Sequence, residues 1–148
     1  MGKKKRDTGK NFESEIRRSL KSSKHIWWFR IQDTNDVNRF IKQAVAEKQP
    51  ADFFSVYRGR PIMVEAKTSR NLTSFPLYYG SGRAIAKHQI DEGLQLERKG
   101  GISLIMIRRE EYRNKKCYAI TPSQAKYLYS KAHGKKSIKW QWFDEHAY

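Results

Sequence analysis

The stretch "PADFFSVYRGRPIMVEAKTS", residues 50–69, decides the fold that we predict. Two runs rich in β-branched and aromatic residues, 53–57 and 62–67, flank the turn sequence "RGRP", whose glycine supplies backbone freedom. This pattern predicts a β-hairpin. Side chains alternate between the two faces of a strand, so the charged residues of "VEAK" are expected on one face and its apolar residues on the other, in the core.

Charged residues recur at fixed places in this hairpin. Glu65 and Lys67 share a face, and Asp52 at the start of the partner strand is expected to approach Glu65. Two carboxylates and a backbone carbonyl suit a hard cation such as Mg²⁺, which would stabilise charge on a phosphodiester and lower the pKa of a bound water. Lys67 would orient that water or hold the phosphate, and Glu13 or Glu15 would complete the site. An E-x-K triplet by itself more often marks a solvated face.

The rest of the chain alternates between helical and strand patterns. We predict helices over 8–23, 35–48, 84–101 and 122–133, strands over 25–32, 102–107 and 116–121, and a long loop over 68–83. The third helix would carry Ile85, Gln89, Glu92 and Leu96 along one stripe, and the last would open with a capping box from Thr121 to Gln124. The aromatic tail 138–148 is left unassigned. The order predicts an α/β fold, a mixed central sheet flanked by helices, as one domain over 11–148 after a basic flexible tail, 1–10.

Basic residues dominate the composition. The chain of 148 residues carries 31 Lys and Arg against 15 Asp and Glu, a net charge of +16, which favours nucleic acid as a partner. No apolar run approaches the roughly 20 residues of a membrane span, so no membrane partner is expected. The one cysteine, Cys117, can build neither a disulfide framework nor a thiolate zinc site, which fits a reducing cytoplasm. The expected location is the cytoplasm of a prokaryotic cell, or of an infected host cell if the source is viral.

Candidate phosphate-binding residues fall into two groups. The first is in the tail, and the second is near the hairpin and the following helix in sequence: Lys3, Lys4, Lys5 and Arg6, then Arg58, Arg60, Arg70, Arg83 and Lys87. Tyr78 and Tyr79 are open to two interpretations, stacking on an unpaired base or packing within the protein.

Three stretches carry a resemblance to a known family. They are "GKNFESEI" at 9–16, the hairpin and its downstream "TSFPL" over 52–77, and "KHQIDEGLQLERKGGISLIMI" at 87–107. Together they resemble the RecU-type Holliday junction resolvases of the PD-(D/E)-x-K nuclease superfamily, whose fold is restriction-endonuclease-like. The triplet E-A-K followed by T-S-F-P-L, and then by H-Q-I opening a helix, is far more specific than E-x-K alone.

The resemblance implies roles for particular residues. Asp52, Glu65 and Lys67 would be the catalytic core, Glu13 the helix carboxylate that joins Asp52 and Glu65 as a metal ligand, and Gln89 a supporting polar residue. The alternative for Gln89 is a surface helix glutamine. The resemblance further implies Mg²⁺, replaceable by Mn²⁺, a four-way DNA junction as substrate, and a homodimer that cuts two strands.

Two departures from the family pattern concern substrate choice. The chain has "QPAD" where the family usually has a threonine ahead of the aspartate, and the segment before Asp52 is shorter than the stalk that the family inserts into the junction. Residues 35–43 would form a reduced stalk or an ordinary packing helix. Two other functions remain open: a PD-(D/E)-x-K nuclease acting on duplex DNA, and a non-catalytic nucleic-acid binder, against which the acidic set argues.

Overall fold

The computed structural model describes residues 8–31, 51–111, 115–132 and 134–148. The basic residues 3–6 and the helix expected over 35–48 lie outside the described residues. The first helix begins at Thr8, ahead of the expected domain start at residue 11. No helix in the described part of the chain has the length and apolar character needed to cross a bilayer.

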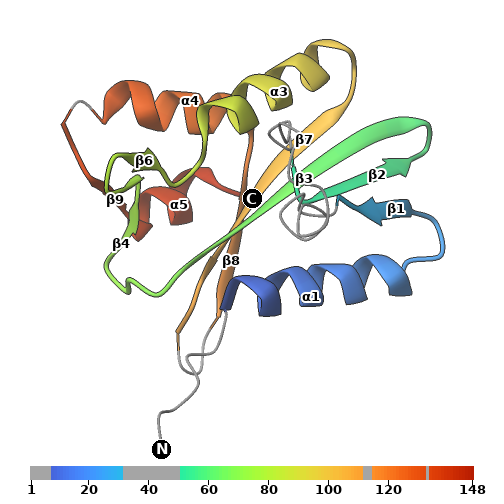
Figure 1. The fold of residues 1–148 in the computed structure, drawn as a ribbon, viewed down its shortest axis with the longest axis horizontal. Helices are drawn as coiled ribbons and strands as arrows, with labels where there is room; N and C mark the ends of the chain where they lie inside the picture. The colour runs from blue at the N-terminus through green and yellow to red at the C-terminus, as the bar shows by residue number, and fades with distance from the viewer. Residues whose placement is uncertain (1–7, 32–50, 112–114, 133) are drawn as a thin grey trace, which may run out of the picture.

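A five-stranded sheet forms the centre of the molecule, in the order β1-β2-β3-β7-β8 (Figure 1). The strands are β1 Trp27–Arg30, β2 Phe53–Tyr57, β3 Arg60–Ser69, β7 Ile102–Arg109 and β8 Lys116–Ile120. β3 and β7 run parallel, from Ile62 opposite Ile102 to Ser69 opposite Arg109, and the other pairs are antiparallel. A mixed sheet of this kind confirms the predicted fold class.

Helices cover both faces of this sheet. α1 (Thr8–Ser22) lies on one side, and α3 (Lys87–Arg98) and α4 (Pro122–Lys131) lie on the other (Figure 1). The α1 side buries Phe12 and Ile16 against Phe53 and Val64. The opposite side holds the larger core, to which β7 and β8 contribute Ile105, Ile107 and Ile120. Each face of β3 therefore meets a different helix layer, which determines where its charged residues point.

The hairpin of β2 and β3 closes with a two-residue turn. Tyr57 pairs with Arg60, so Arg58 and Gly59 form the turn, and both have positive φ angles of 48° and 75°. Two consecutive left-handed residues are what a type I′ turn requires, because its twist matches that of the flanking strands. The predicted hairpin is confirmed, and β3 extends beyond the expected limits at both ends.

The segment 68–83, expected to be a loop, contains short strands instead. β4 (Ser74–Pro76) pairs with β9 (Ser137–Lys139), and β5 (Tyr78–Tyr79) pairs with β6 (Gly82–Arg83). The unassigned tail supplies β9 and α5 (Trp140–His146), whose Trp140 and Phe143 bury their rings around Phe75. Packing between distant segments, rather than local pattern, orders both.

α3 forms within the helix predicted over 84–101. Its buried residues are Ile90 and Gly93, and Ile85 is buried just before the helix begins. A Cβ atom on Gly93 would lie 2.5 Å from Cγ of Pro122 and 2.6 Å from Oγ of Ser103. Glycine therefore allows α3 to approach α4 and β7 closely.

Gly93→Ala is expected to destabilise the fold by about 1–3 kcal/mol, although alanine is the better helix former, because the rigid proline ring cannot yield. Thermal unfolding followed by circular dichroism measures the effect. Gly82→Ala is the control, since its Cβ would meet no atom closer than 3.6 Å. Equal melting temperatures for the two variants would contradict the close-packing argument.

Candidate active site

Asp52, Glu65 and Lys67 converge where β2 starts alongside the middle of β3. The backbone N–H of Asp52 donates to the carbonyl of Val64 at 3.1 Å, and its Oδ2 accepts from the N–H of Ala66 at 2.7 Å. Lys67 Nζ lies 2.7 Å from Glu65 Oε1. The strand pairing that the hairpin sets up thus places the three side chains of the sequence prediction together.

Gln89 joins this set from the first turn of α3. In β3, Glu65 and Lys67 lie opposite Ile105 and Ile107 in register, on the face that α3 covers. The Gln89 side chain hydrogen-bonds to the Glu65 carboxylate, while its Oε1 accepts from the backbone N–H of Ala86 at 3.0 Å. An ionised carboxylate only accepts hydrogen bonds, so the amide NH₂ of Gln89 is the group that donates to Glu65. Gln89 is therefore half-buried against Glu65 and is not a solvent-facing glutamine, while its supporting role in catalysis stays a prediction.

Burial sets the electrostatics of Glu65. The residue is 6% exposed, and this burial raises the pKa of Glu65 to about 7, with the neighbouring Asp52 adding to the rise. The Lys67 charge and the hydrogen bonds from Lys67 and Gln89 act in the opposite direction. Two carboxylates this close, one of them buried, favour binding of a cation because it compensates their shared charge.

The donor set fits a hard divalent cation only in part. Asp52 and Glu65 provide two carboxylates, as suits Mg²⁺, which keeps several waters. Within the described ranges, however, no group of three His, Cys, Asp or Glu side chains is placed to hold a metal ion. The third carboxylate that was expected, Glu13, is not brought to the pair.

Helix α1 explains where Glu13 and Glu15 lie. The helix packs on the face of β3 that carries Val64, opposite to that of Glu65 and Lys67. Glu13 forms an ion pair with Arg30 of β1. Glu15 forms an ion pair with Arg108 of β7 at 2.5 Å. Neither residue therefore joins Asp52 and Glu65 in a three-carboxylate group.

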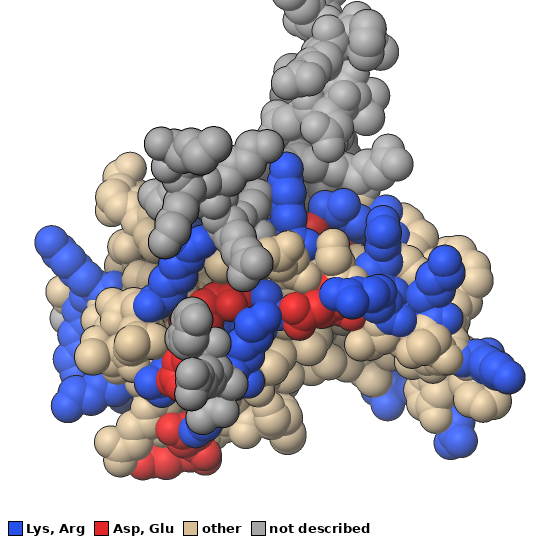
Figure 2. All heavy atoms as spheres, turned by 90° about the horizontal axis from the view of Figure 1, so that it is seen from below, with Lys and Arg blue, Asp and Glu red and all other residues tan. Residues whose placement is uncertain are grey.

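The expected phosphate-binding residues are spread over several parts of the surface. Arg60 donates to the carbonyl of Gly100 at 3.2 Å. At about 3.3 Å per residue, it lies roughly 16 Å along β3 from Glu65. Arg58 lies in the turn beyond Arg60. Arg70 follows β3, and Arg83 and Lys87 lie next to the start of α3. Figure 2 shows basic side chains spread across the face seen from the α1 side, with acidic ones near its middle.

Some relevant residues were missed from the sequence. Arg108 is buried on β7, and Lys126 lines a hollow between α3 and α4. The position of Arg108 directly after the apolar run "ISLIMI" could have indicated that it is buried. No sequence signal distinguishes Lys126 from the other lysines of this basic chain. Of the two tyrosines, Tyr78 packs edge-on against Tyr129, in agreement with packing within the protein. Tyr79 is 58% exposed, so stacking on a base stays open for it.

The raised pKa of Glu65 predicts a pH-dependent stability. Its ordinary value is 4.5 and its folded value is about 7, so between these pH values the folded chain keeps a proton that the unfolded chain has lost. Stability contributed by this residue is therefore present below pH 4.5 and is lost as pH rises towards 7.

Urea unfolding in metal-free buffer from pH 4.5 to 8 tests this expectation. Glu65→Gln, which cannot ionise, should gain stability relative to the natural protein as pH rises to about 7 and hold that gain above it. A difference between the two proteins that stays constant over this range would contradict the raised pKa.

Comparisons with known proteins identify relatives for this architecture. The Holliday junction resolvase RecU of Bacillus pumilus is 40% identical over 68 residues, which is 45% of this chain and 31% of that protein. The resolvase of the same name from Bacillus subtilis is 30% identical over 111 residues, covering 73% of this chain and 50% of that protein. The chain thus spans half or less of the length of these relatives.

A solved structure and a family model extend the comparison to nearly the whole chain. Hjc, a Holliday junction resolvase from Archaeoglobus fulgidus, aligns with a TM-score of 0.50 at 12% identity over 88% of this chain and 86% of its own, which shows a shared fold. The model of the family "Recombination protein U" matches residues 8–148, which include every described element. The chain therefore belongs to the RecU family, as the resemblance of its motifs predicted.

Proposed function

We propose that this protein is a metal-dependent endonuclease that hydrolyses phosphodiester bonds in branched DNA, acting as a Holliday junction resolvase in recombination and repair. The observation that carries the proposal is the convergence of Asp52, Glu65, Lys67 and Gln89 in a chain of the RecU family. The net charge of +16 supports a nucleic-acid substrate.

Asp52 and Glu65 would hold the metal, which when bound stabilises charge on the phosphodiester and lowers the pKa of a bound water. Mg²⁺ is proposed, with Mn²⁺ able to replace it. Asp52 is fixed by the N–H of Ala66, so its carboxylate is held in place before the substrate arrives. Gln89 would orient the Glu65 carboxylate through the hydrogen bond between their side chains. A catalytic role for Glu13 stays a prediction. In the structure Glu13 forms an ion pair with Arg30.

Lys67 has two roles open to it in this arrangement. Its ammonium contacts Glu65 at 2.7 Å, and a metal on that carboxylate would compete for the same charge. Released from Glu65, the ammonium would donate to the attacking water or to a phosphate oxygen, as expected for the lysine of this site.

A cleavage assay tests the proposal. The protein is incubated with a synthetic four-way junction, a linear duplex and a single strand, each with Mg²⁺ or with EDTA. We expect cutting of the junction with Mg²⁺ alone. Equal cutting of the duplex would favour a PD-(D/E)-x-K nuclease of different specificity, and binding without any cutting would favour a non-catalytic nucleic-acid binder.

We further propose that the active species is a homodimer. A four-way junction has near two-fold symmetry, and two nicks on opposed strands are needed to resolve it, so two identical sites in a C2 dimer match the substrate. Light scattering over a concentration series, together with junctions labelled on each strand in turn, tests this. A monomer at micromolar concentration that nicks one strand per junction would contradict it.

A further inference from the structure

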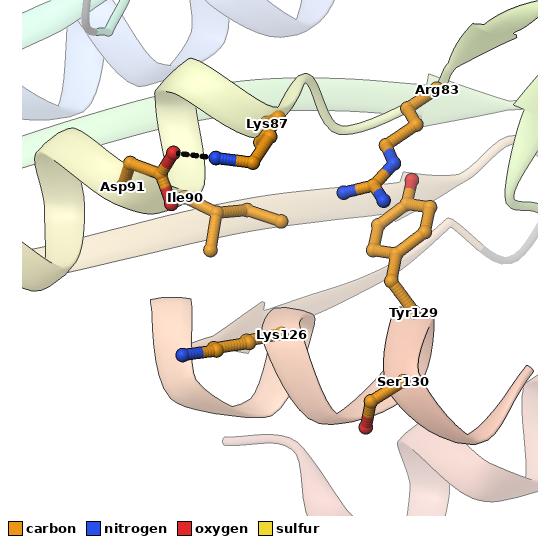
Figure 3. A pocket seen from close by; sticks show the side chains of 7 residues that line it. All are labelled: Arg83, Lys87, Ile90, Asp91, Lys126, Tyr129 and Ser130. Carbon is orange, nitrogen blue, oxygen red and sulfur yellow. Dashed lines mark hydrogen bonds and ion pairs between the residues drawn. The ribbon is translucent and has the colours of Figure 1, made fainter.

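A groove between α3 and α4 gathers positive charge outside the candidate active site. It encloses about 240 Å³ and is lined by Arg83, Lys87, Ile90 and Asp91 on one side and by Lys126, Tyr129 and Ser130 of α4 on the other (Figure 3). A second hollow of about 430 Å³ shares Arg83, Lys87 and Asp91 with it, so the groove continues along the start of α3.

The three basic side chains of the groove come from three separate elements and surround a single carboxylate. Arg83 belongs to β6, Lys87 to α3 and Lys126 to α4. Lys87 Nζ lies 2.6 Å from Asp91 Oδ2, and together the hydrogen bond and charge of Lys87, with the charges of Lys126 and Arg83, lower the pKa of Asp91. Three cations against one anion leave the groove positively charged, which favours an anionic ligand.

Arg83 is held in position by an ordered aromatic ring. Its guanidinium carbon lies 4.6 Å from the centroid of the Tyr129 ring. The Tyr129 hydroxyl donates to the carbonyl of Leu77 and accepts from the N–H of Ile85, both at 3.0 Å. These two hydrogen bonds restrict the Tyr129 ring, and stacking on the ring restricts the Arg83 side chain in turn. Arg83 therefore loses less conformational entropy when it binds an anion.

The groove is distinct from the catalytic set although both involve the first turns of α3. Lys87 and Asp91 are four residues apart and share one side of the helix, as their ion pair shows. Gln89, which contacts Glu65, is two residues from each and therefore about 200° around the helix, at 3.6 residues per turn. An anion in the groove would consequently be a different phosphate from the one at Glu65.

We propose that this groove binds a backbone phosphate of the DNA substrate away from the scissile bond, through Arg83, Lys87 and Lys126. The proposal rests on the nuclease function proposed above and adds a second point of attachment. A phosphodiester has two non-bridging oxygens that share one negative charge, and guanidinium and ammonium groups donate hydrogen bonds to such oxygens. Contacts of this kind fix the register of DNA on a protein without reading its sequence. The groove would thus align the strand so that the correct bond reaches Glu65.

Lys126→Ala is the sharpest test, because Lys126 is exposed and its described electrostatic partner is Asp91. Binding is measured by fluorescence anisotropy of a labelled four-way junction in EDTA, so that no cleavage occurs. We expect at least about threefold weaker binding at 50 mM salt, and a slope of log affinity against log salt that is lower by about 0.9, as for one lost phosphate contact.

Two further variants complete the design. Lys131→Ala, on the same helix but outside the groove, is the charge-matched control and should keep the salt slope of the natural protein. Asp91→Asn removes the one carboxylate of the groove and should tighten binding. It provides an independent test should Lys126→Ala fold poorly.

The outcomes separate the groove from the function on which it rests. If the natural protein does not bind the junction, the proposed function fails. If it binds, but Lys126→Ala equals Lys131→Ala in affinity and salt slope and Asp91→Asn does not tighten binding, the groove proposal alone is overturned. Weaker binding of Lys126→Ala to junction and linear duplex in equal measure agrees with a backbone contact that reads no sequence.

Discussion

Glu65→Gln is expected to lower the rate of junction cleavage by roughly a factor of 10³ or more. Glutamine keeps the size of the side chain and the partner for Gln89, but it removes one of two negative ligands that would hold the metal. Transition-state stabilisation by a metal is worth several kcal/mol, and each 1.36 kcal/mol is about tenfold in rate. Single-turnover cleavage of labelled junctions with Mg²⁺ measures the loss.

Binding and stability must be measured on the same variant. We expect junction affinity in EDTA to stay within about twofold of the natural protein, because affinity comes mainly from the basic surface. Glu92→Gln, an exposed carboxylate on α3, is the control and should cleave normally. Full cleavage activity of Glu65→Gln would contradict the assignment of Glu65 to the active site. If the variant is less stable than the natural protein at pH 8, the loss of cleavage would instead be explained by a disturbed fold.

Arg108→Met is expected to lower the free energy of unfolding by about 3–5 kcal/mol, the usual cost of removing one partner from a buried ion pair. The Arg108 side chain is only 3% exposed and lies between Glu15 and Glu110, at 2.5 and 2.6 Å. It also lies over the Phe12 ring, 4.4 Å from its centroid. Methionine restores some packing but removes the cation beside the buried carboxylate of Glu110, whereas Glu15 keeps its ion pair with Lys115.

The measurement for this prediction is urea unfolding of the variant beside Arg17→Met, which removes an exposed arginine from α1, the helix that Arg108 contacts. Arg17→Met should change stability by less than about 0.5 kcal/mol. Adding Glu110→Gln to Arg108→Met should recover part of the loss, because the buried carboxylate that has lost its cation is then replaced by a neutral amide. A loss below about 1 kcal/mol in Arg108→Met would mean that α1 is held by its apolar residues alone.

The sequence was sufficient for the hairpin and for the set on it, because both follow from local rules. Alternation along β3 places Glu65 and Lys67 on one face, and the turn at Gly59 brings Asp52 into register with them. The same rules do not say which face of a sheet a helix will cover. The family resemblance implied Glu13 beside Glu65, whereas α1 packs on the other side of β3.

The tail illustrates a second limit of sequence reasoning. The aromatic residues of "WQWF", 140–143, could lie in the core or at an interface with another chain. The segment that packs against them decides between these two places. That partner, β4, is about 60 residues earlier, with Phe75 opposite Ile138. Trp140 and Phe143 pack around Phe75 once this pairing has formed. No period in the sequence encodes a contact over such a separation, so 68–83 was expected to be a loop.

The parallel pairing of β3 with β7 has a consequence for how quickly the protein folds. Each residue of β7 pairs with the residue forty positions earlier, as Ile62 does with Ile102. Closing a loop of that length costs about 3 kcal/mol in chain entropy before any strand contact compensates for it. We expect refolding in milliseconds to seconds rather than microseconds, and hydrogen exchange of the β3 amides only through global unfolding. The hairpin alone can bring Asp52 and Glu65 together, whereas the burial of Glu65 would be completed only at the end of folding, when β7 and α3 join the sheet.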